Sequence, residues 1–232
     1  MRKIVIVAFF TLILLFGCSE NRQAIMDQNT AALARLEAAG NIGMSALADT
    51  TEMLPEQPID PRTVYNTSGG SGVNTDILTM DNPEAYLNND FLDLFLSHSV
   101  EEILLAQAEP ARLEFWSSVD SLKRDIARAA SMRYLALVRA IYITPIEQPG
   151  DSLFTGARAK FEIVLIDIEQ EKVLLRTFVK AKPDAKVDYV YENEDERYSR
   201  ENAFIRSSLW ENSRENILAA LAEATGGRFL LQ

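Results

Sequence analysis

The sequence predicts an α+β fold, with N-terminal helices, a small antiparallel sheet of about three strands and a C-terminal helix packed on it. Three observations support this. Apolar residues recur at helical spacing up to residue 131, β-branched and aromatic residues dominate 134–181, and helical spacing returns after residue 199. Segregated helices and strands are typical of α+β domains. The composition, 47% hydrophobic and 25% charged over 232 residues, is that of a globular protein, so we expect one folded domain with appendages.

The first 17 residues have the organisation of a secretory signal peptide. Arg2 and Lys3 precede an uncharged apolar stretch, residues 4–17, which is shorter than the roughly 20 residues that cross a bilayer as a helix. The small residue Gly17 stands where cleavage is expected. We therefore expect residues 1–17 to be removed and to take no part in the fold.

Four residues at this site resemble a known family signature. Leu15, Phe16, Gly17 and Cys18 are similar to the lipobox recognised by the lipoprotein signal peptidase, although Phe16 is larger than the family's usual residue. The resemblance implies a bacterial lipoprotein that is cut before Cys18 and held on a membrane by acyl chains on that cysteine. Ser19, in place of aspartate, implies export to the outer membrane, facing the periplasm. The inner membrane and the cell surface are the alternatives.

Cysteine usage and net charge agree with a lipid-anchored chain. Cys18 is the only cysteine, so it cannot form an internal disulfide. Loss of Arg2 and Lys3 changes the formal charge from −11 to −13. Such a charge argues against binding nucleic acid or lying flat on anionic lipid, and it is compatible with a basic protein partner or bound cations.

After the anchor, residues 18–54 are expected to form an Ala-rich helical tether. The apolar positions of a helix over 22–48 recur at three- and four-residue steps, and Gly40 and Gly43 predict a break in its second half. The helix is either a coiled-coil stalk or a helix packed on its own domain. The second interpretation is favoured because Asn29 and Gly40 interrupt any heptad pattern. The apolar positions are Met26, Leu33, Leu36, Ala39 and Leu47.

Residues 55–75 are rich in Pro, Gly and Ser and predict a linker or long exposed loop, which would give the following domain reach away from the membrane. The glycines at 69, 70 and 72 do not indicate a phosphate-binding loop, because no lysine follows them and no clear strand precedes them. The α+β periplasmic domain is expected over 76–232.

Helices are expected first in this domain. Asn82, Pro83 and Glu84 predict a helix start that continues to about residue 96. Ser99 and Glu102 form a capping-box pattern, and Pro110 marks another start. One apolar stripe then follows, which we expect to pack on the sheet: Phe115, Val119, Leu122, Ile126 and Ala129.

Strands are expected at 134–144, 157–169 and 172–181. The last two should form an antiparallel hairpin, because the connection between them is too short for a parallel crossover. After an acidic loop over 183–198, Ser199 can cap a helix that Gly226 and Gly227 stop. Residues 229–231 could add an edge strand. The predicted buried face of that helix contains Trp210, Ile217, Leu221 and Ala224.

The hairpin resembles that of periplasmic lipoproteins related to curli-secretion and peptidoglycan-synthase-activator proteins, in which a D-x-x-T-G turn joins two strands. Asp167 matches this pattern, and Gln170 and Glu171 replace Thr-Gly. The resemblance covers residues 111–225 as an order of elements and implies no functional residue.

The chain is poor in catalytic side chains. His98, the only histidine, has Ser97 and Ser99 beside it, but sequence neighbours rarely form a catalytic triad. Without a second histidine or a free cysteine, the usual zinc sites and Cys/His catalysis are excluded. The acidic run over 192–196 could hold a cation or a basic partner, but it lacks the glycine of a calcium loop and is interpreted as a solvated loop. It contains Glu192, Glu194, Asp195 and Glu196.

Tyrosines concentrate in the strand region and could form a binding surface, although strand composition also explains them. They are Tyr134, Tyr142, Tyr189, Tyr191 and Tyr198. We assign no catalytic residue, cofactor or metal. The main hypothesis is a non-enzymatic binding or scaffold module, held on the membrane through acylated Cys18 and bound to an envelope protein. The alternatives are a carboxylate-dependent hydrolase of cell-wall or glycan substrates and a small-ligand carrier or transport accessory.

Overall fold

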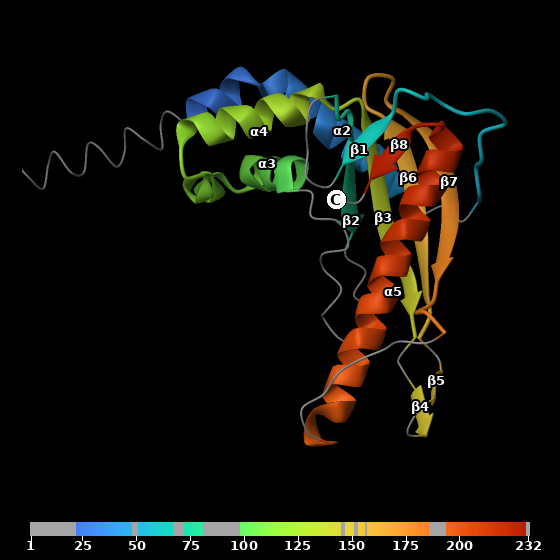
Figure 1. Cartoon of the computed structure of the whole chain (residues 1–232). Helices are drawn as coiled ribbons and strands as arrows, with labels where there is room; N and C mark the ends of the chain where they lie inside the picture. Colours follow the sequence, from blue (N-terminus) through green and yellow to red (C-terminus); the bar gives the residue numbers. More distant parts are fainter. Residues whose placement is uncertain are drawn as a thin grey trace, which may run out of the picture. The chain divides into compact units, whose positions relative to one another are not determined.

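A computed structural model describes residues 22–47, 51–66, 72–80, 98–144, 147–150, 153–155, 157–185 and 194–230. The chain divides into two compact units (Figure 1). The helical unit contains the described residues up to 38 and those from 98 to 132, and the sheet unit contains the rest. Together they confirm the α+β class. The sequence prediction places residues 18–54 in a tether and residues 76–232 in one domain.

The helical unit consists of short helices with buried aliphatic side chains. Residues 22–28 are helical, a turn follows at Asn29, and α2 spans Thr30–Ala46. Helix α3 spans His98–Ala108 and contacts the 3-10 helix η2, Pro110–Phe115, and helix α4, Val119–Ser131. The unit's buried apolar side chains include Met26, Leu33, Leu36, Ile103, Leu113, Leu122 and Ile126.

Of two predicted helix starts in this unit, the one at Ser99 was wrong and the one at Pro110 is confirmed as the start of a 3-10 helix. Ser99 lies inside α3 instead of capping it. Pro110 begins a 3-10 helix, and Ser118 caps α4 separately by accepting a hydrogen bond from the Ser121 backbone N–H. The predicted stripe therefore does not run through a single helix. Phe115 is 73% exposed, whereas Leu122, Ile126 and Ala129 are buried as predicted and α4 packs on α3.

The expected break in the first helix is absent, since α2 continues through both glycines to Ala46. Its C-terminal part, in the sheet unit, packs on the sheet. A Cβ at Gly43 would lie 2.4 Å from Leu137 Cδ1 and 2.9 Å from Ile166 Cδ1, and both of these side chains are buried. Gly43 thus permits close approach of helix and sheet. The helix packs within the fold, which favours the packed interpretation over a free stalk.

Alanine at the two glycines is expected to have opposite effects. Gly40→Ala should raise the free energy of unfolding by about 1 kcal/mol through helix propensity, because nothing lies within 4 Å of its Cβ position. Gly43→Ala should lower the free energy of unfolding by about 1 to 2 kcal/mol. The steric cost of placing a methyl group against Leu137 and Ile166 exceeds the gain in helix propensity. Urea unfolding of both variants measures this, and equal shifts of the same sign would contradict the packing of α2.

The sheet has four strands in the order β2-β3-β6-β7. The predicted strands are confirmed as β3, Tyr134–Ile143, β6, Ala159–Asp167, and β7, Lys172–Ala181. Neighbouring pairs among these three are antiparallel, as expected for the hairpin. Strand β2, Thr75–Met80, was not predicted and pairs parallel with β3. The sheet is therefore mixed, not purely antiparallel.

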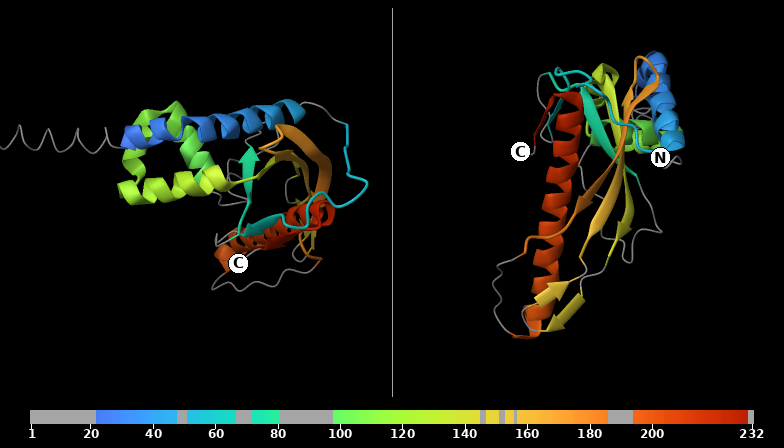
Figure 2. Two further views of the ribbon diagram at one scale, coloured as in Figure 1. Left: turned by 90° about the horizontal axis from the view of Figure 1, so that it is seen from above. Right: turned by 90° about the vertical axis from the view of Figure 1, so that its right-hand side faces the viewer.

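Helix α5, Glu194–Thr225, covers one face of this sheet, and the Ala39–Ala46 part of α2 lies on the other (Figure 2). Leu209, Ile217 and Leu221 join the core formed by alternate residues of β3 and β6, including Phe161 and Ile163. The helix ends before Gly226, whose φ of +74° is the left-handed conformation that glycine favours. Ser199 and residues 194–196 lie inside α5, so the predicted loop ends earlier and the predicted cap is wrong.

Two small two-stranded sheets complete the described elements. Strand β1, Val64–Asn66, pairs parallel with β8, Arg228–Leu230, and Tyr65 stacks on Phe229 with ring centroids 6.2 Å apart. Strands β4, Glu147–Gly150, and β5, Leu153–Thr155, form an antiparallel pair. The expected C-terminal strand exists as β8. Its partner β1 lies in residues 55–75, for which the sequence predicts a linker or long exposed loop.

The segment 51–60, which we call the strap, is attached at both ends. Met53 forms two backbone hydrogen bonds with Arg176 of β7, 2.8 and 2.9 Å long. The backbone N–H groups of Ile59 and Asp60 donate to the carbonyls of Ala224 and Thr225 at the end of α5. The strap therefore links the edge of the sheet to α5, and residues 55–66 are not a free linker.

Among the described residues no helix is long and apolar enough to span a membrane. The helix predicted from Asn82 to about residue 96 lies outside the described residues.

Candidate functional site

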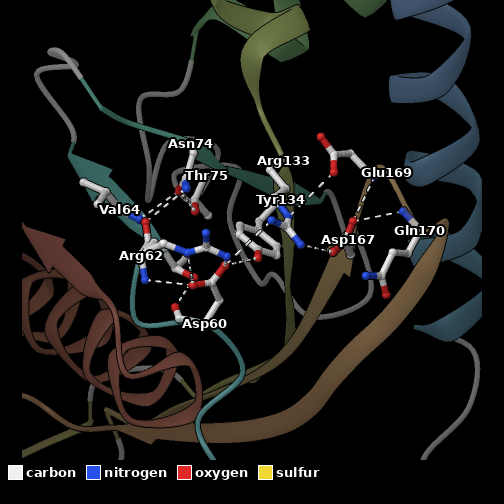
Figure 3. Close-up of polar contacts among 11 residues, drawn as sticks. Asp60, Arg62, Val64, Asn74, Thr75, Arg133, Tyr134, Asp167, Glu169 and Gln170 are labelled. Carbon is white, nitrogen blue, oxygen red and sulfur yellow. Dashed lines mark hydrogen bonds and ion pairs between the residues drawn. The ribbon is translucent and has the colours of Figure 1, made fainter.

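A network of charged side chains surrounds Asp60 at one end of the sheet unit (Figure 3). Asp60, 7% exposed, begins a tight turn in which its carbonyl accepts the backbone N–H of Thr63 at 3.0 Å. Proline at position 61 suits the second position of such a turn, and the aspartate suits the first. The turn directs the Asp60 carboxylate towards the start of β3.

Three groups donate hydrogen bonds to the Asp60 carboxylate. The Arg62 guanidinium forms a bidentate pair, with Nε 2.9 Å from Oδ1 and Nη2 3.0 Å from Oδ2, and the Arg62 backbone N–H also donates to Oδ1. The Tyr134 hydroxyl donates to Oδ2 at 2.8 Å. Arg133 Nη1 lies 3.8 Å from Oδ2. The side-chain and then the backbone hydrogen bonds from Arg62 hold the pKa of Asp60 well below its usual range.

Arg133 extends the network to the hairpin turn between β6 and β7. Its Nη2 lies 3.4 Å from Asp167 Oδ2, and its Nε lies 4.0 Å from Glu169 Oε2. Asp167 is 2% exposed, and its other oxygen accepts the backbone N–H groups of Glu169 and Gln170. Asp167 thereby caps the turn between β6 and β7.

Asn74 connects this network to the unpredicted strands. Its side chain accepts the Val64 backbone N–H at 2.8 Å and donates to the Arg62 carbonyl at 3.1 Å, while its own carbonyl accepts the N–H groups of Arg133 and Tyr134. One asparagine therefore joins β1, the start of β2 and the start of β3. The network as a whole cross-links the turn, both sheets and the hairpin.

The protonation of Asp60 and of Tyr134 stays constant around neutral pH. Burial, together with the hydrogen bond to Asp60, raises the pKa of Tyr134 to about 12, so that the hydroxyl remains protonated. The Asp60 carboxyl remains ionised because its pKa is lowered. General acid or base catalysis is most effective when a group titrates near the working pH. Neither group satisfies this condition, and the arrangement is that of a structural cross-link.

The raised pKa of Tyr134 predicts a loss of stability in alkali. The unfolded tyrosine titrates near pH 10 and the folded one near 12, so its contribution is complete below pH 10 and falls as the pH rises through this window. Between pH 10 and 12 the stability difference between the native chain and Tyr134→Phe should shrink by about 2 to 3 kcal/mol. Urea unfolding across this range measures it, and a constant difference would contradict the assignment.

A second buried charge pair crosses β3 and β6 on the face opposite α5. Arg139 Nη2 lies 2.6 Å from Oε2 of Glu162, which is 2% exposed, and it also donates to the Leu47 carbonyl after α2. On β7, Arg176 Nη1 donates to the Thr51 carbonyl at 2.7 Å, and Thr177 Oγ1 donates to Glu52 at 2.9 Å. These contacts attach Leu47 and the first residues of the strap to the sheet.

The sequence-predicted site residues lie largely outside the described residues. Leu15, Phe16, Gly17, Cys18 and Ser19 belong to this undescribed part, as do Glu192, Tyr189 and Tyr191. Helix α5 contains Glu194, Asp195, Glu196 and Tyr198 in its first turns, and His98 begins the described part of α3. Within the described part of the chain, no group of three acidic, histidine or cysteine residues could hold a metal ion.

The tyrosines do not form one exposed surface. Tyr134 is buried in the network around Asp60, whereas Tyr142 is 38% exposed near the other end of β3. Sequence reasoning missed Asp60, Arg62 and Asn74. The Asp-Pro-Arg-Thr turn could have indicated Asp60, but no local signal connects it to Arg133, which is distant in the chain.

Comparisons with known proteins identify no family. No family model and no curated protein matches the chain. A solved structure, the hypothetical protein CT253 from Chlamydia trachomatis, is similar over 66% of this chain and 96% of its own, with 11% sequence identity and a TM-score of 0.30.

Proposed function

We propose that the chain is a lipid-anchored lipoprotein of the bacterial envelope and acts as a non-enzymatic binding or scaffold module. Cys18 would carry the acyl chains, which provide stable anchoring when two or more are present. Ser19 favours the outer membrane, facing the periplasm, as the location. The first described helix starts at residue 22, four residues after Cys18 in the sequence.

The observation that carries the non-enzymatic part is the pairing of three buried acids, Asp60, Asp167 and Glu162. Asp60 and Asp167 contact arginines and backbone N–H groups, and Glu162 contacts Arg139. A carboxylate-dependent hydrolase needs one acid whose pKa is raised and a second one that is free to face the substrate. The pKa of Asp60 is shifted in the opposite direction, and its oxygens are already occupied. Structural use of these acids supports a binding module over the hydrolase.

The acidic surface suggests the chemistry of the partner. The processed chain would carry a formal charge of −13, which disfavours nucleic acid and strongly anionic lipid and favours a protein with a basic face. Electrostatic attraction of this kind weakens as salt is added. The expected partner is therefore a basic envelope protein held through salt-sensitive contacts.

Affinity purification from detergent-solubilised membranes tests the proposal. A tagged full chain should recover the same envelope protein in near-stoichiometric amount with the tag at either of two positions, and recovery should fall as salt rises. Cys18→Ser is the matched control and should recover much less, because the uncut, lipid-free precursor is not exported to the membrane that holds the partner. Repeated absence of any partner, with turnover of peptidoglycan or glycan substrates by the purified chain, would overturn the proposal.

A further inference from the structure

Phe115 is the most exposed of the large apolar side chains in the described part of the chain, at 73%. Its neighbours Leu113 and Trp116 are only 4% and 8% exposed. Leu113 lies in η2 and Trp116 directly follows it, three residues further along, which is the repeat of a 3-10 helix. Both side chains therefore face inward, and Phe115 between them faces outward. The exposure of Phe115 is thus a consequence of how η2 is built.

The element that presents Phe115 is held firmly. Arg112 of η2 forms an ion pair with Glu109, the residue before η2, at 2.8 Å, and the Trp116 indole N–H donates to Asp125 of α4 at 2.9 Å. The Trp116 carbonyl accepts a hydrogen bond of 2.8 Å from Arg22 Nη2. Phe115 therefore has a defined position next to the start of the first described helix.

That start is close to the proposed anchor along the chain. Cys18 precedes Arg22 by four residues, and a fully extended chain of this length spans at most about 14 Å. Within the helical unit, the start of the first helix, η2 and the start of α4 lie at the same end (Figure 1). The end that presents Phe115 is the end to which the acyl chains would be joined.

We propose that Phe115 inserts into the surface of the bilayer that holds Cys18, so that the helical unit is seated on the membrane. This inference rests on the proposed lipid anchor. The acyl chains supply the affinity, and the phenyl ring supplies a second contact that fixes the unit's orientation. Glu114 lies beside Phe115, so only the phenyl ring inserts, and it inserts to a shallow depth. Because the whole chain is acidic, the membrane surface must carry little negative charge. Aromatic side chains are enriched at the membrane–water interface of membrane proteins.

Hydroxyl-radical footprinting of the native phenylalanines tests the contact without altering Phe115. The acylated full chain is bound to phosphatidylcholine vesicles that contain no other protein, and the Cys18→Ser chain made without residues 1–17, in solution, serves as the reference. Oxidation of Phe115 should be at least threefold slower on the vesicles. Phe204, on α5 and 42% exposed, is the matched control and should be oxidised at the same rate in both samples.

Each other outcome overturns the inference in a distinguishable way. Equal oxidation of Phe115 in vesicle-bound and reference samples would overturn the membrane contact while leaving the anchor intact. Protection that requires an added envelope protein would make Phe115 a protein-docking residue instead. An unmodified Cys18 in the mass spectrum of the same sample would overturn the anchor and the inference together.

Phe115→Ser should leave the thermal midpoint unchanged and remove the restriction on rotation of the vesicle-bound unit, measured by fluorescence anisotropy.

Discussion

Replacing Arg139 with methionine is expected to lower the free energy of unfolding by about 3 to 5 kcal/mol. The change leaves the carboxylate of Glu162, which is 2% exposed, without its arginine partner in the sheet. It also removes the hydrogen bond to the Leu47 carbonyl. An uncompensated buried charge is costly because the desolvation of the ion is no longer offset. Equilibrium urea unfolding at neutral pH measures the loss.

The double variant Arg139→Met with Glu162→Leu provides the control for this effect. Removing both charges together should recover most of the lost stability, since apolar residues of similar volume can replace a buried ion pair at little cost. If the double variant is as unstable as the single one, the cost arises from the Leu47 contact or from packing, not from the orphaned charge.

Asp60→Ala is expected to cost about 3 kcal/mol. The change removes the charge-assisted bonds from Arg62 and leaves the buried Tyr134 hydroxyl without its acceptor. Because the folded pKa of Asp60 lies below its unfolded value, its contribution is present above the unfolded pKa and disappears as the pH falls. The difference between native and variant stability should therefore shrink in acid.

Arg62→Ala is the matched control for Asp60→Ala. The Arg62 side chain is 78% exposed, and its removal leaves the buried Asp60 carboxylate with the backbone N–H of residue 62, the Tyr134 hydroxyl and Arg133 as partners. We therefore expect a clearly smaller loss than for Asp60→Ala in the same urea titration. Equal losses for the two variants would show that the ion pair, and not the buried contacts of Asp60, dominates the network.

The strands with strong local patterns were predicted well. Strand β7 has the predicted bounds, and β6 and its antiparallel pairing follow from alternating residues and a connection too short for a crossover. The long apolar run over residues 134–144 also predicted β3. These features depend on neighbouring residues, which is the information a sequence pattern contains.

Elements that depend on distant partners were missed. Strand β1 has three residues between a proline-rich and a glycine-rich stretch, and only its pairing with β8 at the other end of the chain makes it a strand. Strand β2 similarly relies on parallel pairing with β3. The break expected at Gly40 and Gly43 did not occur, because packing of α2 on Leu137 and Ile166 outweighs the low helix propensity of glycine.

The error at Phe115 had a local cause. A single α-helical repeat was applied across Pro110 to Ser131, whereas Ser118 starts a new helix and η2 follows a three-residue repeat. The polar network was found only from the structure, apart from the turn signal at Asp60. The lipobox, in contrast, was found from the sequence alone, and its residues lie outside the described residues.

The nature of the chain's anchor is tested most directly by mass spectrometry of the N-terminal peptide after expression of the full chain in a bacterium. The account predicts a mature chain that begins at Cys18 and carries a thioether-linked diacylglycerol, and an uncut, lipid-free precursor from Cys18→Ser. A mature chain that begins elsewhere, or an unmodified Cys18, would contradict it.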